Sequence, residues 1–202
     1  MKTAIINGRV LTPEGIVEGK SLILADGKIL GFEGSVPAGA EVIDARGSWV
    51  SPGFIDMHTH GAGGADFMDG TMEAYLTAAR MHARHGTTLL FPTTLTSTNE
   101  ALFESLETYE KALAQSGKDG AAFGGMHLEG PYFAPEMAGA QDPRYLRDPQ
   151  PEDYNAILDK TDKIARWSFA PERKGAPEFA AEVKKRGIVS SIGHTNASFA
   201  DC

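Results

Sequence analysis

From about residue 51 onwards, apolar runs alternate with stretches in which apolar residues recur at helical spacing. Alternation of this kind is typical of βα units that build a parallel sheet. A closed (β/α)8 barrel has eight strands and about 250 residues, so the sequence is roughly three strands short of one. Five runs are predicted to be strands, and they lie near residues 54–60, 87–95, 121–129, 163–170 and 187–194.

The helices between these strands are indicated by apolar stripes and capping signals. A capping-box pattern at 97–100 predicts the start of a second helix. Residues 151–162 predict a weaker helix, and a proline at 177 followed by basic residues up to Gly187 predicts the last one. The first helix ends at Gly86, and its expected face consists of Met72, Tyr75, Leu76, Ala79 and Ala83.

Residues 1–50 show a different pattern, in which short β-rich arms flank three turns that contain glycine. The segments TAII-NG-RVL, LILA-DG-KIL and VIDA-RG-SWV each have this form. Such segments are typical of β-hairpins, so we expect three of them. The sequence therefore predicts a small all-β domain over residues 1–50, followed by a barrel-type domain over residues 51–202.

Composition narrows the classes of partner. The chain has 202 residues, 42% of them hydrophobic, and a formal net charge of -8 without a long cluster of Lys and Arg. An acidic chain of this kind is not expected to bind nucleic acid or an anionic membrane, so a small-molecule substrate is the better hypothesis. The only cysteine, Cys202, allows no internal disulfide, and no apolar run approaches about 18 residues. We therefore expect a cytoplasmic protein.

The segment PGFIDMHTHG at 52–61 places His58 and His60 one residue apart at the end of an apolar run. On a strand, side chains at i and i+2 project from the same face about 7 Å apart, so the two imidazoles could converge on one ion. The alternative is that two polar residues simply close a strand. This motif alone does not decide between them.

Further candidate ligands recur at the ends of the later predicted strands. His127 and Glu129 end the third strand, and His194 ends the last. In a parallel barrel the carboxyl ends of the strands meet around one mouth, where active sites are built. Imidazole nitrogens and a carboxylate oxygen are the ligands that a zinc- or iron-type ion prefers. The pattern therefore predicts a metal centre at this rim.

These motifs resemble a known family. The segment at 52–61 resembles the first-strand signature of the amidohydrolase superfamily. HLEGPYF at 127–133 and GHTNA at 193–197 resemble the N-acetylglucosamine-6-phosphate deacetylase family within it. The resemblance implies a TIM-type (β/α)8 barrel with a small N-terminal β-sandwich, of which this chain supplies most of the sandwich and about five βα units. It also implies hydrolysis of N-acetylglucosamine 6-phosphate to glucosamine 6-phosphate and acetate.

The resemblance further implies a role for each candidate residue in a site with one or two divalent ions, zinc or iron. Glu129 and His194 would be metal ligands. Where two ions are present, His58 and His60 would bind one of them and Glu129 would bridge both. His127 would orient a ligand from outside the coordination sphere.

Two neighbouring residues, Ala140 and Gln141, match a segment that contacts the sugar in the family, although several members have histidine where this chain has Gln141. The general-base aspartate, a further histidine ligand and the phosphate-binding groups of the family lie on later strands, so we expect them beyond residue 202. We also expect a homo-oligomer, a dimer.

Two alternatives to deacetylation remain open. A related amidohydrolase could act on a cyclic amide or a dipeptide instead. The 202 residues could also be a non-catalytic truncated fragment, because they lack the general-base aspartate of the family.

Overall fold

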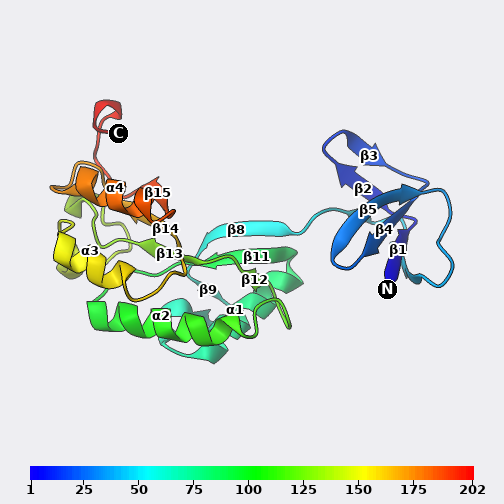
Figure 1. The fold of residues 1–202 in the computed structure, drawn as a ribbon, viewed down its shortest axis with the longest axis horizontal. Helices are drawn as coiled ribbons and strands as arrows, with labels where there is room; N and C mark the ends of the chain where they lie inside the picture. The colour runs from blue at the N-terminus through cyan, green and yellow to red at the C-terminus, as the bar shows by residue number, and fades with distance from the viewer. The chain divides into compact units, whose positions relative to one another are not determined.

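The computed structural model describes residues 1–202, which divide into two compact units, Met1–Gly53 and Phe54–Cys202. Figure 1 shows the course of the chain through both units, and each is described by itself. None of the helices combines the length and the apolar character that a bilayer crossing needs.

The first unit is built from two small sheets around the buried side chains of Ala4, Val10, Leu22 and Ile23. The four-stranded sheet has the order β5-β4-β1-β6 and the three-stranded sheet the order β3-β2-β7. The strands are β1 (Lys2–Ile6), β2 (Arg9–Thr12), β3 (Gly15–Val17), β4 (Ser21–Ala25), β5 (Lys28–Glu33), β6 (Glu41–Asp44) and β7 (Trp49–Val50).

Of the three predicted hairpins, only the one at Asp26-Gly27 is present, where β4 pairs antiparallel with β5. The other two predictions were wrong. The turn at Asn7-Gly8 joins β1 to β2, and the turn at Arg46-Gly47 joins β6 to β7, but in both cases the two strands belong to different sheets. Arg46 and Gly47, with φ values of 50° and 78°, closely match Asp26 and Gly27, with 51° and 74°. Turn residues therefore determine where the chain bends, but not which strands pair. Both edges of β1 are occupied, by β4 on one side and β6 on the other, so β2 does not pair with it.

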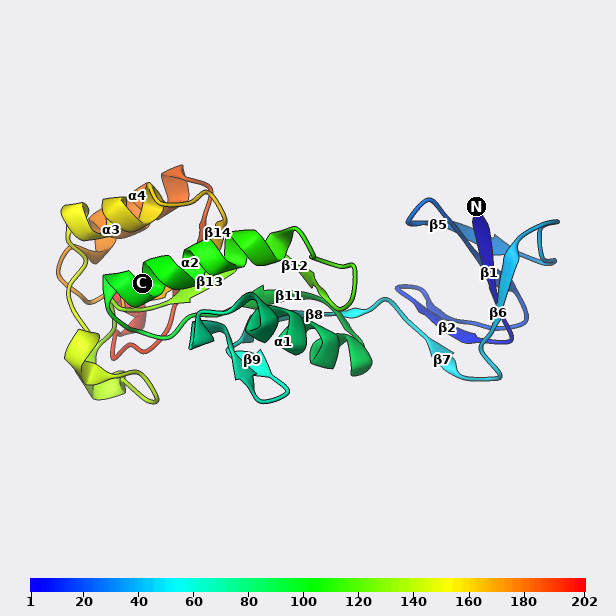
Figure 2. The ribbon, with the colours of Figure 1, turned by 90° about the horizontal axis from the view of Figure 1, so that it is seen from below.

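The second unit is α/β, with parallel strands that form part of a barrel (Figures 1 and 2). One sheet has the order β12-β11-β8 and the other β13-β14-β15, and a parallel bridge between Thr93 and His127 joins β11 to the second sheet. The five predicted strands are confirmed, with the third in two pieces. Their bounds are β8 (Phe54–Thr59), β11 (Thr87–Pro92), β12 (Ala122–Phe123), β13 (Met126–Glu129), β14 (Ile164–Phe169) and β15 (Val189–Ile192).

The third strand is interrupted at Gly124-Gly125, where neighbouring chains approach closely. A Cβ on Gly124 would lie 2.5 Å from the Phe91 ring, and one on Gly125 would lie 2.5 Å from the Cβ of Ala165. Only glycine fits both contacts. The break lets β12 pair with β11 while β13 pairs with β14, so that Glu129 ends its strand beside β14.

Four helices accompany these strands: α1 (Met72–Arg84), α2 (Asn99–Leu113), α3 (Pro151–Leu158) and α4 (Ala176–Lys185). The capping pattern at 97–100 predicted the start of α2 correctly, but the cap lies one residue later than the pattern implied: the hydroxyl of Thr98, not of Ser97, accepts from the Ala101 amide. In α1 the predicted face is buried only in its middle, at Tyr75 and Ala79, whereas Met72 and Ala83 are exposed. The short elements are β9 (Gly61–Ala62), β10 (Ala65–Asp66), η1 (Phe67–Asp69), η2 (Pro135–Met137), η3 (Pro143–Tyr145) and η4 (Phe199–Asp201).

The core of this unit lies where the helices pack on the strands. Tyr75 and Tyr109 pack against Phe123, and Trp167 packs edge-on against Phe179 of α4. These side chains belong to a single buried cluster, which holds the strands in register and their carboxyl ends together.

Candidate metal centre

The predicted ligands come from the carboxyl ends of three parallel strands. Glu129 is the last residue of β13, His58 lies near the end of β8, and His60 directly follows β8. His194 lies just after β15. The fold therefore brings to one rim residues that lie far apart in the sequence.

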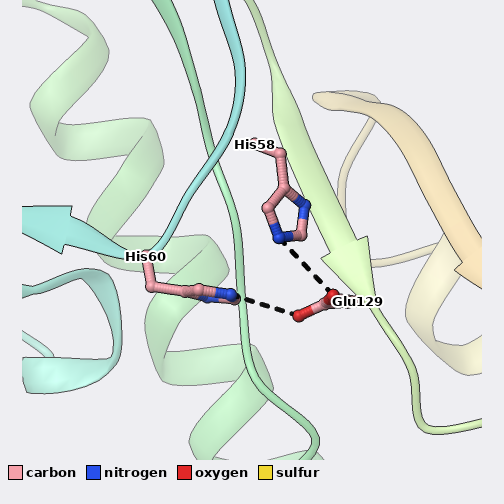
Figure 3. Close-up of side chains that lie close together, drawn as sticks. All are labelled: His58, His60 and Glu129. Atoms are coloured by element: carbon pink, nitrogen blue, oxygen red, sulfur yellow. Dashed lines mark ion pairs between the residues drawn. The ribbon is translucent and has the colours of Figure 1, made fainter. Parts of the chain in front are cut away.

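Both histidines of the HxH motif point towards the Glu129 carboxylate (Figure 3). Nε2 of His58 lies 3.5 Å from Oε1, and Nε2 of His60 lies 3.2 Å from Oε2. One ligand atom from each of the three residues falls within 4.8 Å of the others. Nε2 of His194 lies 3.1 Å from Oε1. All three histidines therefore converge on the carboxylate of Glu129, a residue that is only 7% exposed.

The proton positions on two of these imidazoles follow from their outer partners. Nδ1 of His60 lies 3.1 Å from the Thr93 carbonyl, and Nδ1 of His194 lies 2.8 Å from the Met137 carbonyl. A carbonyl only accepts, so Nδ1 must carry the proton in both rings. In the neutral imidazoles, Nε2 then directs a lone pair at the carboxylate. Such an arrangement is repulsive unless a cation lies between. That cation is either a proton on Nε2, which then donates to Glu129, or a metal ion, which the donor set fits.

Electrostatics keep the carboxylate ionised. Burial by itself raises the pKa of Glu129, but the hydrogen bond with His60, the charge of His58 and the hydrogen bond with His194 outweigh it and lower the pKa to about 2. The hydrogen bond with Glu129 in turn raises the pKa of His60, whereas burial lowers that of His58. An anionic carboxylate is the form that binds a cation.

His127 is buried and sits behind His58. Its Nδ1 lies 3.3 Å from Nδ1 of His58, and its Nε2 lies 2.7 Å from the hydroxyl of Ser168. Burial, followed by the charge of Arg166, lowers the pKa of His127 to about 4, so the ring is neutral at pH 7. A neutral ring can accept the Nδ1 proton of His58, which leaves Nε2 of His58 free to face Glu129.

The two residues predicted to contact the sugar differ in their surroundings. Ala140 is exposed. Gln141 is buried, and its side-chain amide donates to Oε2 of Glu129 at 2.7 Å. The structure therefore places Gln141 against a predicted ligand.

Sequence reasoning missed the groups that orient the histidines. Two of them, at Thr93 and Met137, are backbone carbonyls, which no residue type marks. The third is the hydroxyl of Ser168, which lies on a predicted strand. Neighbouring side chains on a strand point to opposite faces, so the only sequence signal for Ser168 was that it should face away from the side on which Trp167 lies.

The sequence pattern of the amidohydrolase family matches residues 49–196. The chain belongs to this family. The resemblance of residues 52–61 to the amidohydrolase signature is thereby confirmed, and the α/β partial barrel is the part of the amidohydrolase fold that these residues form.

Several sugar-phosphate deacetylases are similar to this protein over almost the whole of its chain. An N-acetylgalactosamine-6-phosphate deacetylase of Escherichia coli O157:H7 is 30% identical over 95% of this chain and 50% of its own length. An N-acetylglucosamine-6-phosphate deacetylase of Lysinibacillus sphaericus is 30% identical over 96% of this chain and 51% of its own. The crystal structure of the Pasteurella multocida N-acetylglucosamine-6-phosphate deacetylase superimposes with a TM-score of 0.90 at 28% identity, over 100% of this chain and 53% of that one. The chain spans about half the length of these relatives.

Proposed function

We propose that this amidohydrolase is a metal-dependent deacetylase that converts N-acetylglucosamine 6-phosphate to glucosamine 6-phosphate and acetate in aminosugar catabolism. The observation that carries the proposal is the convergence of His58, His60 and His194 on Glu129 of the HLEGP motif. The names of the relatives support the same substrate class.

The proposed metal site uses His58, His60, Glu129 and His194 to hold one or two divalent ions, zinc or iron. A bound ion of this kind supplies Lewis acidity that polarises an amide carbonyl. The chain's own residues orient the ligands. The carbonyls of Thr93 and Met137 accept from Nδ1 of His60 and of His194, so that Nε2 of each ring faces the carboxylate of Glu129. His127 does the same for His58.

The second candidate substrate is N-acetylgalactosamine 6-phosphate. The Escherichia coli relative named for that sugar is as similar to this chain as the Lysinibacillus sphaericus enzyme is. The two sugars differ in the configuration at one hydroxyl-bearing carbon, so both carry the same acetamide and the same phosphate. The deacetylation chemistry at the metal site would be the same.

The proposal includes the architecture. Residues 1–50 would form part of a small β-sandwich, and residues 51–202 the N-terminal part of a (β/α)8 barrel. In support, β8 and β15 each pair along one edge only, which leaves an edge for a further strand on either side. The general-base aspartate and the phosphate-binding groups would lie on those further strands. A cytoplasmic location fits the single, unpaired cysteine.

The test is a substrate panel on the intact protein loaded with Zn²⁺. Acetate release would be measured with N-acetylglucosamine 6-phosphate, its galactosamine epimer and unphosphorylated N-acetylglucosamine, and ring opening with a cyclic amide. We expect release from a phosphorylated sugar, and loss of release in Glu129→Gln. Ring opening of the cyclic amide without acetate release from either phosphorylated sugar would replace the proposal with the alternative hydrolase.

A further inference from the structure

We propose that Gln141 is a positioning residue that holds the Glu129 carboxylate in the orientation needed to bind metal. The inference rests on the metal site of the proposed function and deepens it. It replaces the sugar contact that the sequence resemblance suggested for this side chain. The geometry that carries it is a bridge from the Thr96 backbone through Gln141 to Glu129.

The orientation of the Gln141 amide is determined by its partners. The backbone N–H of Thr96 lies 2.7 Å from Oε1 of Gln141, and a backbone N–H can only donate. The amide oxygen therefore faces Thr96, and the NH₂ group must face Oε2 of Glu129, also at 2.7 Å. The side chain is only 4% exposed, so water does not compete readily for either bond.

Residues 94–96 thus hold the main chain of Glu129 directly and its side chain through Gln141. The hydroxyl of Thr94 accepts from the Glu129 amide at 3.4 Å, and the hydroxyl of Thr96 donates to its carbonyl at 3.3 Å. Gln141 extends this support to the carboxylate. With Oε2 bonded to Gln141 and near His60, Oε1 is turned towards His58 and His194.

The loop that carries Gln141 also supports the other predicted ligand. The Met137 carbonyl accepts from Nδ1 of His194, and Gly139, at a φ of 59°, passes close to the same ring. A Cβ on Gly139 would lie 3.4 Å from Cε1 of His194. The backbone N–H of Gln141 donates to the Ala138 carbonyl at 2.9 Å and so closes this turn. Residues 137–141 therefore orient His194 at one end and Glu129 at the other.

These two bonds use one N–H and one oxygen lone pair of the Gln141 amide and leave a second of each. Because the side chain is only 4% exposed, a sugar could reach those groups only if the side chain turned outward and broke one of the two bonds. Leaving a buried donor or acceptor unpaired costs about 1–3 kcal/mol. The neighbouring Ala140, which is exposed, can meet a substrate without that cost. The geometry therefore gives the two residues different roles: Ala140 is placed to contact a substrate, and Gln141 orients the metal ligand Glu129.

The experiment compares Zn²⁺ affinity in the intact wild-type protein and in Gln141→Met, measured by competition with a chromogenic chelator. Methionine keeps the length of the side chain but removes both polar groups. We expect the Kd for Zn²⁺ to rise by about 10- to 100-fold, as for other residues that orient metal ligands. At saturating Zn²⁺, the KM for the aminosugar phosphate should stay within about 2-fold.

Two matched variants separate positioning from general stability. Ser105→Ala removes a buried hydroxyl that bonds Tyr75 and the Phe67 carbonyl, and it should lower thermal stability without changing the Kd for Zn²⁺. Gln141→His retains one donor and one acceptor nitrogen, so it should bind Zn²⁺ more tightly than Gln141→Met. The visible absorption spectrum of the Co²⁺-loaded protein should change in Gln141→Met and not in Ser105→Ala.

The results that overturn the inference are specific. An unchanged Kd for Zn²⁺ in Gln141→Met together with a raised KM would restore the sugar contact. Equal Zn²⁺ affinity in Gln141→His and Gln141→Met would also refute positioning through hydrogen bonds. The proposed function fails separately: if no aminosugar phosphate is hydrolysed but the Kd still depends on Gln141, the positioning role stands.

Discussion

Nε2 of His60 lies 3.2 Å from Oε2 of Glu129, while Nδ1 of the same ring donates to the Thr93 carbonyl. The two contacts leave the space between ring and carboxylate for a cation. A proton on Nε2 can fill that place, which is why the hydrogen bond with Glu129 raises the pKa of His60. A divalent ion would bring more charge than a proton, and His58, His60 and His194 would hold it together with Glu129.

Replacing Glu129 with glutamine should abolish tight metal binding. The variant keeps the shape of the side chain but removes the negative charge towards which the three imidazoles converge. Metal content after gel filtration, measured by elemental analysis, should fall to the level of a blank, and the circular dichroism spectrum should remain that of the wild type. Wild-type metal content in Glu129→Gln would rule out its role as a ligand.

Removing the metal with a chelator should lower the melting temperature. A ligand that binds only the folded state stabilises it by about 2.7 kcal/mol at a concentration of 100 times its Kd. Scanning calorimetry with and without Zn²⁺ at that excess measures the shift. Glu129→Gln serves as the control, and its melting temperature should not respond to Zn²⁺. A response of equal size in the variant would place the stabilising ion elsewhere.

Asp153 should stabilise the fold in a manner that depends on pH. Its carboxylate accepts from Arg147 and Asn99, and from the Tyr132 hydroxyl at 2.8 Å. Burial raises the pKa of Asp153, but these three hydrogen bonds outweigh it and lower the pKa below its ordinary value. A carboxyl with a lowered pKa stabilises the folded state fully above its unfolded pKa, about 3.9, and loses that contribution as the pH falls through the folded pKa.

Urea unfolding of Asp153→Asn measures this contribution. At pH 7 the variant should be less stable than the wild type by about 1.5–3 kcal/mol, the usual range for a hydrogen bond to a charged group. The difference should begin to shrink as the pH falls below about 4, where the carboxyl of the unfolded chain takes up a proton, and it should be lost once the pH falls through the lowered pKa of the folded state. A difference that stays constant from pH 7 to pH 3 would show that the charge of Asp153 contributes nothing.

Phe179 should be the most costly core position in α4. Its ring is fully buried and packs against the rings of Tyr132, Tyr154, Trp167 and Phe169. Phe179→Ala should lower the free energy of unfolding by about 3–5 kcal/mol, the usual cost of such a cavity. Lys185→Ala, at an exposed position of the same helix, should cost less than about 1 kcal/mol. Similar costs for the two variants would contradict the packing described for α4.

The βα part of the fold was predictable because burial leaves a periodic trace in the sequence. Apolar runs marked the five strands, and the capping pattern at 97–100 marked the start of α2 to within one residue. The pairing in residues 1–53 was not predictable from the turns. Asn7-Gly8 and Arg46-Gly47 bend the chain as expected, but the strands that they join pair with others.

The sequence by itself determined the identity of the candidate ligands, because histidines and a glutamate stand at predicted strand ends within motifs that resemble a family. Only the tertiary structure decided what surrounds them. The carbonyls of Thr93 and Met137 orient two imidazoles, and any residue type offers a carbonyl. Gln141 reaches Glu129 because a turn brings the two together and the Thr96 amide fixes which end of the side chain faces the carboxylate. Such contacts depend on how distant segments pack, and local sequence carries no signal for that.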